Sequence, residues 1–454
     1  MINDFVKYFV RKILRCLPDN LRRHIFDEIR SDNYRNSLLQ QQEAERRIGL
    51  AISVSNLDDF DAAEAHLREA ARLDPYNLQI APHLGRIRFL KSRSLDRAAQ
   101  EQNRAMLEVI GSMHRELESS DPIYVPSEFW ETFGKFHMQL LERYGIENFK
   151  RTVSHNYQNW FMVSMEDPQV RQLLKTWPTH FSTQAWLNTI EVPDHVGLHT
   201  SLTFDEPSYP LAFAEKREIY RIAVGLLWEF VNDTDSFGVM EQLAELEVGN
   251  PVRIYRRGRL ISSDIAHSVR ERQMLLNSIS CHGNEGLIVG ELGAGHGRLA
   301  EVFGQTTNYR YYIFDITPAL YVSQWYLKSI FPNERLFEFR HFDSFDEIRD
   351  ELQQCRFAFF TANQIELIPD DHLHLFINMN SLTEMRIDQI RNFLGHIDRL
   401  TTRAFLSRQW IKWENVFDGH SVTKDIFALG KRWRLAVDKP DDIYPEFFNQ
   451  VWVR

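Results

Sequence analysis

The C-terminal part of the chain alternates short apolar runs with longer amphipathic stretches. Each run has the length of a strand, and the stretch after it places apolar residues at helical spacing. Strands that alternate with helices form a parallel, doubly wound sheet, so this part predicts an α/β fold. The predicted strands lie at residues 287–291, 311–315, 357–361, 373–378 and 404–407.

Two further apolar runs, residues 433–437 and 450–453, close the chain. A long loop joins them and no helix intervenes. Consecutive strands without a crossover helix pair antiparallel. We therefore predict a hairpin at one edge of the sheet.

The rest of the chain has a mostly helical pattern. At 454 residues it is too long for one ordinary core. We divide it into four parts: an N-terminal amphipathic helical segment (1–40), a helical repeat-like region (41–120), a mostly helical substrate or cap section (121–280) and the α/β domain (281–454).

Residues 44–77 carry the pattern of a helical repeat. Ala63, Leu67, Ala70 and Pro75 stand at the offsets of the second helix of a tetratricopeptide repeat. The residues that follow repeat the pattern poorly, and two units are fewer than a free-standing array needs. An ordinary helical hairpin explains the pattern equally well. We predict a TPR-like region that offers a candidate groove for a protein partner.

Composition limits the classes of function. The net charge is −10 and no long basic tract occurs, so we expect no nucleic-acid partner. Cys16, Cys281 and Cys355 form neither a disulfide framework nor a zinc pattern, which fits a reducing compartment. No apolar run has transmembrane length, and the first residues lack the continuous apolar core of a signal peptide. We expect a cytoplasmic protein.

The N-terminal segment is basic and amphipathic. Within residues 1–26, Phe9 and Ile13 share a helix face that Lys7 and Arg11 avoid. Such a helix can lie on an anionic membrane surface or pack on its own protein. We favour packing, and keep weak peripheral contact with the inner membrane face as the alternative.

The predicted strand at 287–291 leads into a glycine turn. Gly293, Gly295 and Gly297 stand at alternate positions, and an amphipathic stretch begins at Arg298. Glycines let the backbone turn tightly and let a ligand approach bare main chain. The helix start offers that ligand unpaired N–H groups. The segment predicts a ligand site, and a glycine turn without a ligand is the alternative.

The next predicted strand ends in an acid, Asp315. It follows the glycines by about one helix, the spacing at which a carboxylate at the tip of the next parallel strand reaches ribose hydroxyls. Asp315 could also cap the helix that starts near Thr317 and Pro318. The two roles are compatible, so we expect a ligand that contains a nucleoside.

Two cofactor classes use such a turn. A dinucleotide site has G-x-G-x-x-G. Its third glycine falls on Arg298 when counted from Gly293, but on Ala300, an allowed substitute, when counted from Gly295, so a dinucleotide stays open. The closer match is E-x-G-x-G-x-G, with Glu291 as the acid. This motif and the closing strand pair resemble class I S-adenosylmethionine-dependent methyltransferases. Their cofactor has no pyrophosphate, but it has an α-amino group that a carboxylate can receive.

Further segments extend the match, and together with the glycine turn they make residues 126–454 resemble a bacterial family of sugar O-methyltransferases. One departure is His374, where that family leads us to expect an acid. The matching segments are Glu128-Phe129-Trp130-Glu131, Phe149-Lys150-Arg151-Thr152, Gly249-Asn250-Pro251, Ile261-Ser262-Ser263-Asp264, Asp315-Ile316-Thr317-Pro318, Val322-Ser323-Gln324 with Tyr326-Leu327, and Ile377-Asn378 through Ser381 to Glu384-Met385.

The resemblance implies a class I methyltransferase (Rossmann-like) sheet and S-adenosylmethionine as the cofactor. For the general base we select Glu384, after the fourth strand, and His155, in the middle section. Either could instead be structural, since an acid at a helix start complements the helix dipole. No tight carboxylate cluster indicates a metal. The residues assigned to the cofactor are Glu291, Gly293, Ala294, Gly295, Gly297, Asp315, Ile316, Asn363, Gln364 and Asn378.

We therefore expect transfer of a methyl group from S-adenosylmethionine to a sugar hydroxyl of a glycan, glycolipid or nucleotide sugar. Two alternatives remain. One is a TPR-type interaction protein with a non-catalytic methyltransferase-like domain. The other is an NAD-linked oxidoreductase.

Overall fold

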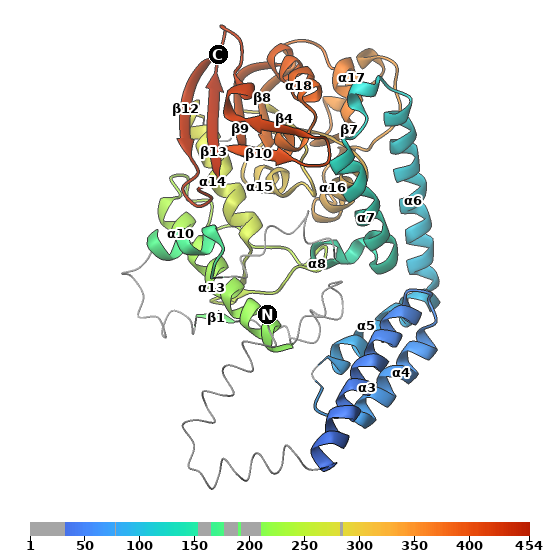
Figure 1. The fold of residues 1–454 in the computed structure, drawn as a ribbon. Coiled ribbons are helices and arrows are strands. Elements are labelled where there is room, and N and C mark those ends of the chain that lie inside the picture. The colour runs from blue at the N-terminus through green and yellow to red at the C-terminus, as the bar shows by residue number, and fades with distance from the viewer. Residues whose placement is uncertain (1–31, 78, 153–164, 177–188, 192–209, 282–284) are drawn as a thin grey trace. The chain divides into compact units, whose positions relative to one another are not determined.

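A computed structural model describes residues 32–77, 79–152, 165–176, 189–191, 210–281 and 285–454 (Figure 1). The chain divides into two compact units. One comprises Met1–Ser92 with Asp205–Pro210, and the other comprises Arg93–Phe204 with Leu211–Arg454.

The first unit contains an antiparallel helical hairpin made by α3 (Asp32–Ser55) and α4 (Phe60–Leu73), followed by α5 (Ile80–Leu95), which continues into the second unit. The side chain of Asp59 accepts a hydrogen bond from Ala62 N and caps α4. Small and apolar residues of both helices are fully buried, Ala51 and Leu67 among them. The two helices lie where the repeat pattern predicts them, but an isolated helix pair has the same geometry. The tetratricopeptide interpretation stays a prediction.

The second unit opens with helices. Ser262 caps α14 by accepting a hydrogen bond from Ile265 N. The helices are α6 (Arg97–Glu118), η1 (Pro122–Tyr124), α7 (Glu128–Tyr144), η2 (Ile146–Asn148), α8 (Phe149–Thr152), α10 (Pro168–Thr176), α13 (Pro210–Thr234) and α14 (Ser263–Ser278), with a small sheet of β1 (Ile190–Glu191), β2 (Tyr255–Arg256) and β3 (Arg259–Leu260).

The second unit continues into a large sheet with strand order β12-β13-β9-β8-β4-β5-β7-β6. β4 to β9 run parallel, and β13 pairs antiparallel with both β9 and β12. The strands are β4 (Ile288–Leu292), β5 (Arg310–Asp315), β6 (Leu336–Phe337), β7 (Phe357–Thr361), β8 (Leu373–Met379), β9 (Thr401–Trp410), β12 (Arg434–Pro440) and β13 (Phe447–Val453).

The α/β prediction is confirmed for this part of the chain. All five predicted parallel strands form, and the closing hairpin lies at the sheet edge as expected. Two features are additional: the short edge strand β6, and a separate hairpin of β10 (Lys412–Asn415) and β11 (His420–Thr423). The connecting helices are α15 (Arg298–Thr306), α16 (Ala319–Ile330), η3 (Phe345–Glu347), α17 (Arg349–Leu352), η4 (Ala362–Leu367), η5 (Ser381–Glu384), α18 (Ile387–Leu400) and η6 (Lys424–Phe427).

Helices cover both faces of the sheet (Figure 1). On one face, Phe314 and Phe360 stack with ring centroids 5.3 Å apart, in a buried cluster with Phe393 of α18. On the other face, Phe303 of α15 packs on Tyr311 of β5. Because the sheet is buried on both sides, its central strands are continuously apolar, which is why their positions are readable in the sequence.

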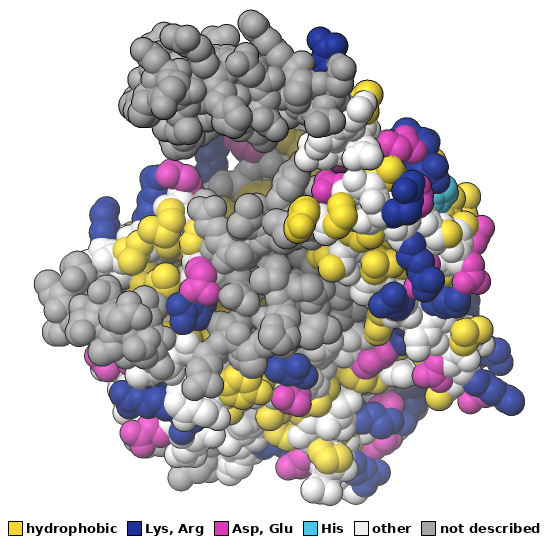
Figure 2. All heavy atoms as spheres, turned by 90° about the horizontal axis from the view of Figure 1, so that it is seen from below, with side chains coloured by type: hydrophobic (Ala, Val, Ile, Leu, Met, Phe, Trp, Pro, Cys, Tyr) yellow, Lys and Arg dark blue, Asp and Glu magenta, His cyan; other side chains and the backbone are white. Residues whose placement is uncertain are grey.

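Among the helices that the structure describes, none is both long and apolar enough to cross a membrane. The described side chains on the face shown in Figure 2 carry charges of both signs, and Lys and Arg are interspersed with Asp and Glu.

Candidate active site

The glycine turn sits between β4 and α15. Gly293, Gly295 and Gly297 have φ angles of +72°, +62° and +84°, a left-handed conformation that side chains disfavour. A Cβ at Gly293 would lie 2.2 Å from the Oγ of Ser381, so only glycine fits there. Two of the glycines, Gly293 and Gly295, line a cavity. The backbone conformation therefore favours glycine at all three positions, and close packing against Ser381 also requires it at Gly293.

Two acids flank the turn at neighbouring strand ends. Glu291 is buried in β4, and its Oε2 accepts a hydrogen bond of 2.8 Å from the hydroxyl of Tyr311. At the end of β5, Asp315 accepts hydrogen bonds from Gly295 N at 3.0 Å and from Ile316 N at 2.8 Å. Burial raises the pKa of Glu291 to about 8 and the pKa of Asp315 to about 7. Both acids thus lie in the cavity wall, and burial is the largest influence on the pKa of each.

The cavity opens over the carboxyl ends of the parallel strands, where α/β sheets bind ligands. Its volume is about 290 Å³, at the lower end of the roughly 300–1,000 Å³ of small-molecule sites. From the predicted set, the cavity is lined by Glu291, Gly293, Ala294, Gly295, Asp315, Ile316 and Glu384.

Glu384 lies in η5, directly after β8. Its backbone carbonyl accepts hydrogen bonds from Ser127 Oγ at 3.1 Å and from Asn415 Nδ2 at 3.4 Å. Burial raises the pKa of its carboxyl group to about 8. A carboxyl group that titrates near physiological pH and faces a cavity is suited to accept a proton from a substrate.

A second wall of the cavity comes from the middle section. η1 and α7 contribute an aromatic surface, and Ser127 Oγ caps α7. The sequence predicts a substrate or cap section at residues 121–280 but names none of these aromatic residues as site residues, although two of them stand in a segment that matches the sugar O-methyltransferase family. Its aromatic residues are Tyr124, Phe129, Trp130, Phe133 and His137.

Four of the predicted residues lie elsewhere. Asn378 is buried below the turn and donates hydrogen bonds to Leu292 O and Ser381 Oγ. Gln364 accepts from Thr361 N and donates to Arg340 O, so its amide caps η4. The amide of Asn363 donates to Glu116. Gly297 caps α15 and does not line the cavity, and neither do Asn363, Gln364 or Asn378.

Ala362, the residue before Asn363, does line the cavity. The third strand therefore ends at the site, as expected, while the two amide side chains after it point into the protein. His155 lies outside the described residues.

Among the described residues that line the cavity, the carboxyl side chains are Glu291, Asp315 and Glu384, and the guanidinium is that of Arg298. Arg298 was not predicted as a site residue, although it directly follows the glycine motif. A pyrophosphate at this turn would lie beside the carboxyl of Glu291, whereas a ligand cation would be stabilised by it. In the part of the chain that the structure describes, no group of three His, Cys, Asp or Glu side chains could hold a metal ion.

No protein-family model and no curated protein matches the chain. Parts of it are similar to solved structures. One is the magnesium protoporphyrin IX methyltransferase of Synechocystis with bound SAM, at 12% identity and a TM-score of 0.30, covering 42% of this chain and 82% of that one. Another is a sarcosine dimethylglycine methyltransferase from Galdieria sulphuraria, at 9% identity and a TM-score of 0.29, covering 41% and 84%. A SAM-dependent methyltransferase from Aquifex aeolicus shows 10% identity and a TM-score of 0.25, covering 40% and 88%. At these TM-scores the strand order and the cavity of this chain carry the interpretation.

Proposed function

We propose that the chain is an S-adenosylmethionine-dependent methyltransferase. The observation that carries the proposal is the pair of buried carboxyl groups, Glu291 and Asp315, which face one cavity from either side of the glycine turn. Glu291 would receive the α-ammonium group of the cofactor, and Asp315 would accept hydrogen bonds from its ribose. Ile316 and Ala362 offer apolar contact for the base. When bound, the sulfonium supplies an activated methyl group.

We propose that the acceptor is a hydroxyl group, and that Glu384 takes its proton. The carboxyl of Glu384 faces the cavity that the cofactor would share, so a hydroxyl bound there lies within reach of both. Alignment of the hydroxyl and exclusion of water are the remaining tasks of the site. The aromatic wall of Phe129, Trp130 and Phe133 excludes water and offers flat apolar surfaces.

We propose a sugar as the carrier of this hydroxyl, in a glycan, a glycolipid or a nucleotide sugar. The support is the resemblance of residues 126–454 to sugar O-methyltransferases, together with the aromatic wall, because a sugar ring presents an apolar C–H face that packs on aromatic rings. His155 is a second candidate for the base. A protein partner at residues 41–120 and peripheral membrane contact through residues 1–26 remain separate predictions.

The cofactor proposal is tested by calorimetry of the full chain with S-adenosylhomocysteine. We expect one binding site, and weaker binding by Glu291→Ala. A folded protein that binds NADH but not S-adenosylhomocysteine would establish the oxidoreductase alternative. Transfer of a labelled methyl group to cell-envelope glycans from a strain without the protein tests the acceptor, and binding without transfer to any glycan would favour a non-catalytic domain.

A further inference from the structure

Arg298 is the first residue of α15 and lines the same cavity as Glu291. The two residues flank the glycine turn, one at the end of β4 and the other at the start of α15. The side chain of Arg298 is only 15% exposed. A buried guanidinium that faces a cavity is suited to bind an anionic group of a ligand.

The orientation of this guanidinium is fixed from behind. Arg298 donates from Nη1 to Glu271 Oε2 at 2.6 Å and from Nη2 to Glu271 Oε1 at 3.0 Å, and Nη1 also donates to Ser268 Oγ at 2.9 Å. These contacts use three of its N–H groups. A guanidinium has five. Hydrogen bonds to the described residues leave two of its N–H groups unused, and Arg298 lines the cavity, so these two groups are available to a ligand.

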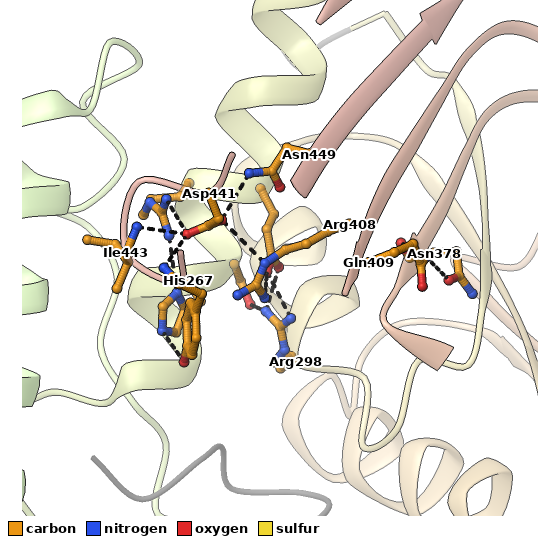
Figure 3. Close-up of polar contacts among 12 residues, drawn as sticks. His267, Arg298, Asn378, Arg408, Gln409, Asp441, Ile443 and Asn449 are labelled. Atoms are coloured by element: carbon orange, nitrogen blue, oxygen red, sulfur yellow. Dashed lines mark hydrogen bonds and ion pairs between the residues drawn. The ribbon is translucent and has the colours of Figure 1, made fainter. Parts of the chain in front are cut away.

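The carboxylate of Glu271 interacts with two arginines, Arg298 and Arg408, so its negative charge is not available to Arg298 only. Nη1 of Arg408 lies 3.4 Å from Glu271 Oε1, and Nε of Arg408 lies 3.3 Å from Asp441. Figure 3 shows Arg298 beside Arg408, and Arg408 reaching toward Asp441. Asp441 is held in turn by Ile443 N and Asn449 Nδ2. This chain of alternating charges holds Arg298 in place, and the negative charge of Glu271 is divided between two arginines.

We propose that Arg298 binds the α-carboxylate of the methyl donor while Glu291 binds its α-ammonium group. The proposal rests on the proposed function, since it names how that cofactor is recognised. The α-ammonium and α-carboxylate groups of an amino acid are attached to one carbon atom. A site that binds both therefore needs a negative and a positive side chain close to each other. Glu291 and Arg298 both line the cavity and supply those charges, and together they select ligands that carry a free α-amino acid.

Ligand variants test this on the unmodified full chain. Calorimetry compares S-adenosylhomocysteine with its carboxyl methyl ester and with 5′-methylthioadenosine, which lacks the amino-acid group altogether. We expect the ester to bind at least about tenfold more weakly than the acid, because it loses charge-assisted hydrogen bonds. Equal affinity for acid and ester overturns the proposal. No binding of any of the three ligands refutes the proposed function instead.

A substitution supplies the second arm. Arg298→Gln should weaken binding of S-adenosylhomocysteine about tenfold or more and leave binding of 5′-methylthioadenosine within about twofold. Binding of the second ligand also shows that the cavity is folded. Arg298→Lys keeps the positive charge but not the paired N–H donors. Its affinity for S-adenosylhomocysteine should therefore lie between those of the wild type and of Arg298→Gln. Equal losses for both ligands would assign Arg298 a purely structural role. If Arg298→Gln does not fold, the comparison of S-adenosylhomocysteine with its carboxyl methyl ester on the unmodified chain decides whether the carboxylate is recognised.

Discussion

Cofactor binding should release protons from Glu291. In the free protein burial raises the pKa of this carboxyl to about 8, so at pH 7 about 0.9 of the molecules carry the proton. A carboxyl that receives an ammonium group must be ionised, and its pKa then falls well below 7. Binding at pH 7 therefore expels about 0.9 proton from Glu291.

The sign of the pH effect follows. Below the raised pKa, Glu291 is protonated in the free protein and must lose this proton before it can bind the ammonium group. The affinity for S-adenosylhomocysteine therefore increases with pH up to about 8. One pKa unit corresponds to about 1.4 kcal/mol, or tenfold in affinity. Glu291→Gln keeps a neutral partner for the hydroxyl of Tyr311 but has no proton to lose. The ratio of wild-type to variant affinity should therefore fall nearly tenfold for each pH unit below about 8.

Calorimetry with S-adenosylhomocysteine in buffers of different ionisation enthalpy measures the number of protons released. Asp315, whose pKa burial raises to about 7, should also release protons when it accepts hydrogen bonds from the ribose, so the wild-type total should exceed that of Glu291 alone. The difference between wild type and Glu291→Gln isolates Glu291. A difference near zero at pH 7, or a ratio of affinities that is constant from pH 6 to pH 8, would refute the assignment of the ammonium group to Glu291.

Three substitutions, with Gly395→Ala as a control, separate catalysis from structure. Glu384→Gln should lower the transfer rate by about 10²–10⁴ with S-adenosylhomocysteine affinity unchanged, measured by single-turnover transfer, and an unchanged rate would exclude it as the base. Gly293→Ala combines left-handed strain with a clash on Ser381, so denaturation should show a loss of about 2–5 kcal/mol, whereas Gly395→Ala, on an open face of α18, should be neutral or stabilising. Asn378→Ala should lower stability by about 2–4 kcal/mol, and unchanged stability with lost ligand affinity would make it a ligand contact.

The sequence located the strand ends well because the central strands are buried on both faces and end in acids. Glu291 pairs with Ile313 in the β4–β5 register, and Asp315 stands two residues after Ile313 at the carboxyl end of β5. Parallel strands bring their carboxyl ends to one edge, so the convergence of these acids required no knowledge of side-chain packing. The two-residue strand β6 had no such signal, because its length is too short to show a period.

Side-chain direction after a strand was harder to predict. Asn363 and Gln364 were assigned to the cofactor from their position after the third strand, yet Gln364 caps η4 together with Thr361. The spacing of Thr361 and Gln364 is that of a capping box, a local pattern that could have assigned Gln364 to structure rather than to a ligand. The aromatic wall had no comparable signal, since its place opposite the strand ends depends on tertiary contacts.

Those contacts show that the cavity is built by segments far from the glycine motif as well as by the motif itself. Gln389, at the start of α18, donates hydrogen bonds to Ile123 O at 2.9 Å and to Val125 O at 2.8 Å. Ser127 Oγ both caps α7 and donates to Glu384 O. The segment that carries the aromatic wall is therefore hydrogen-bonded to the segment that carries the proposed base. A displacement of α7 would move Glu384 with it, so the distance between acceptor wall and base is set by residues about 260 positions apart, including some upstream of residue 126.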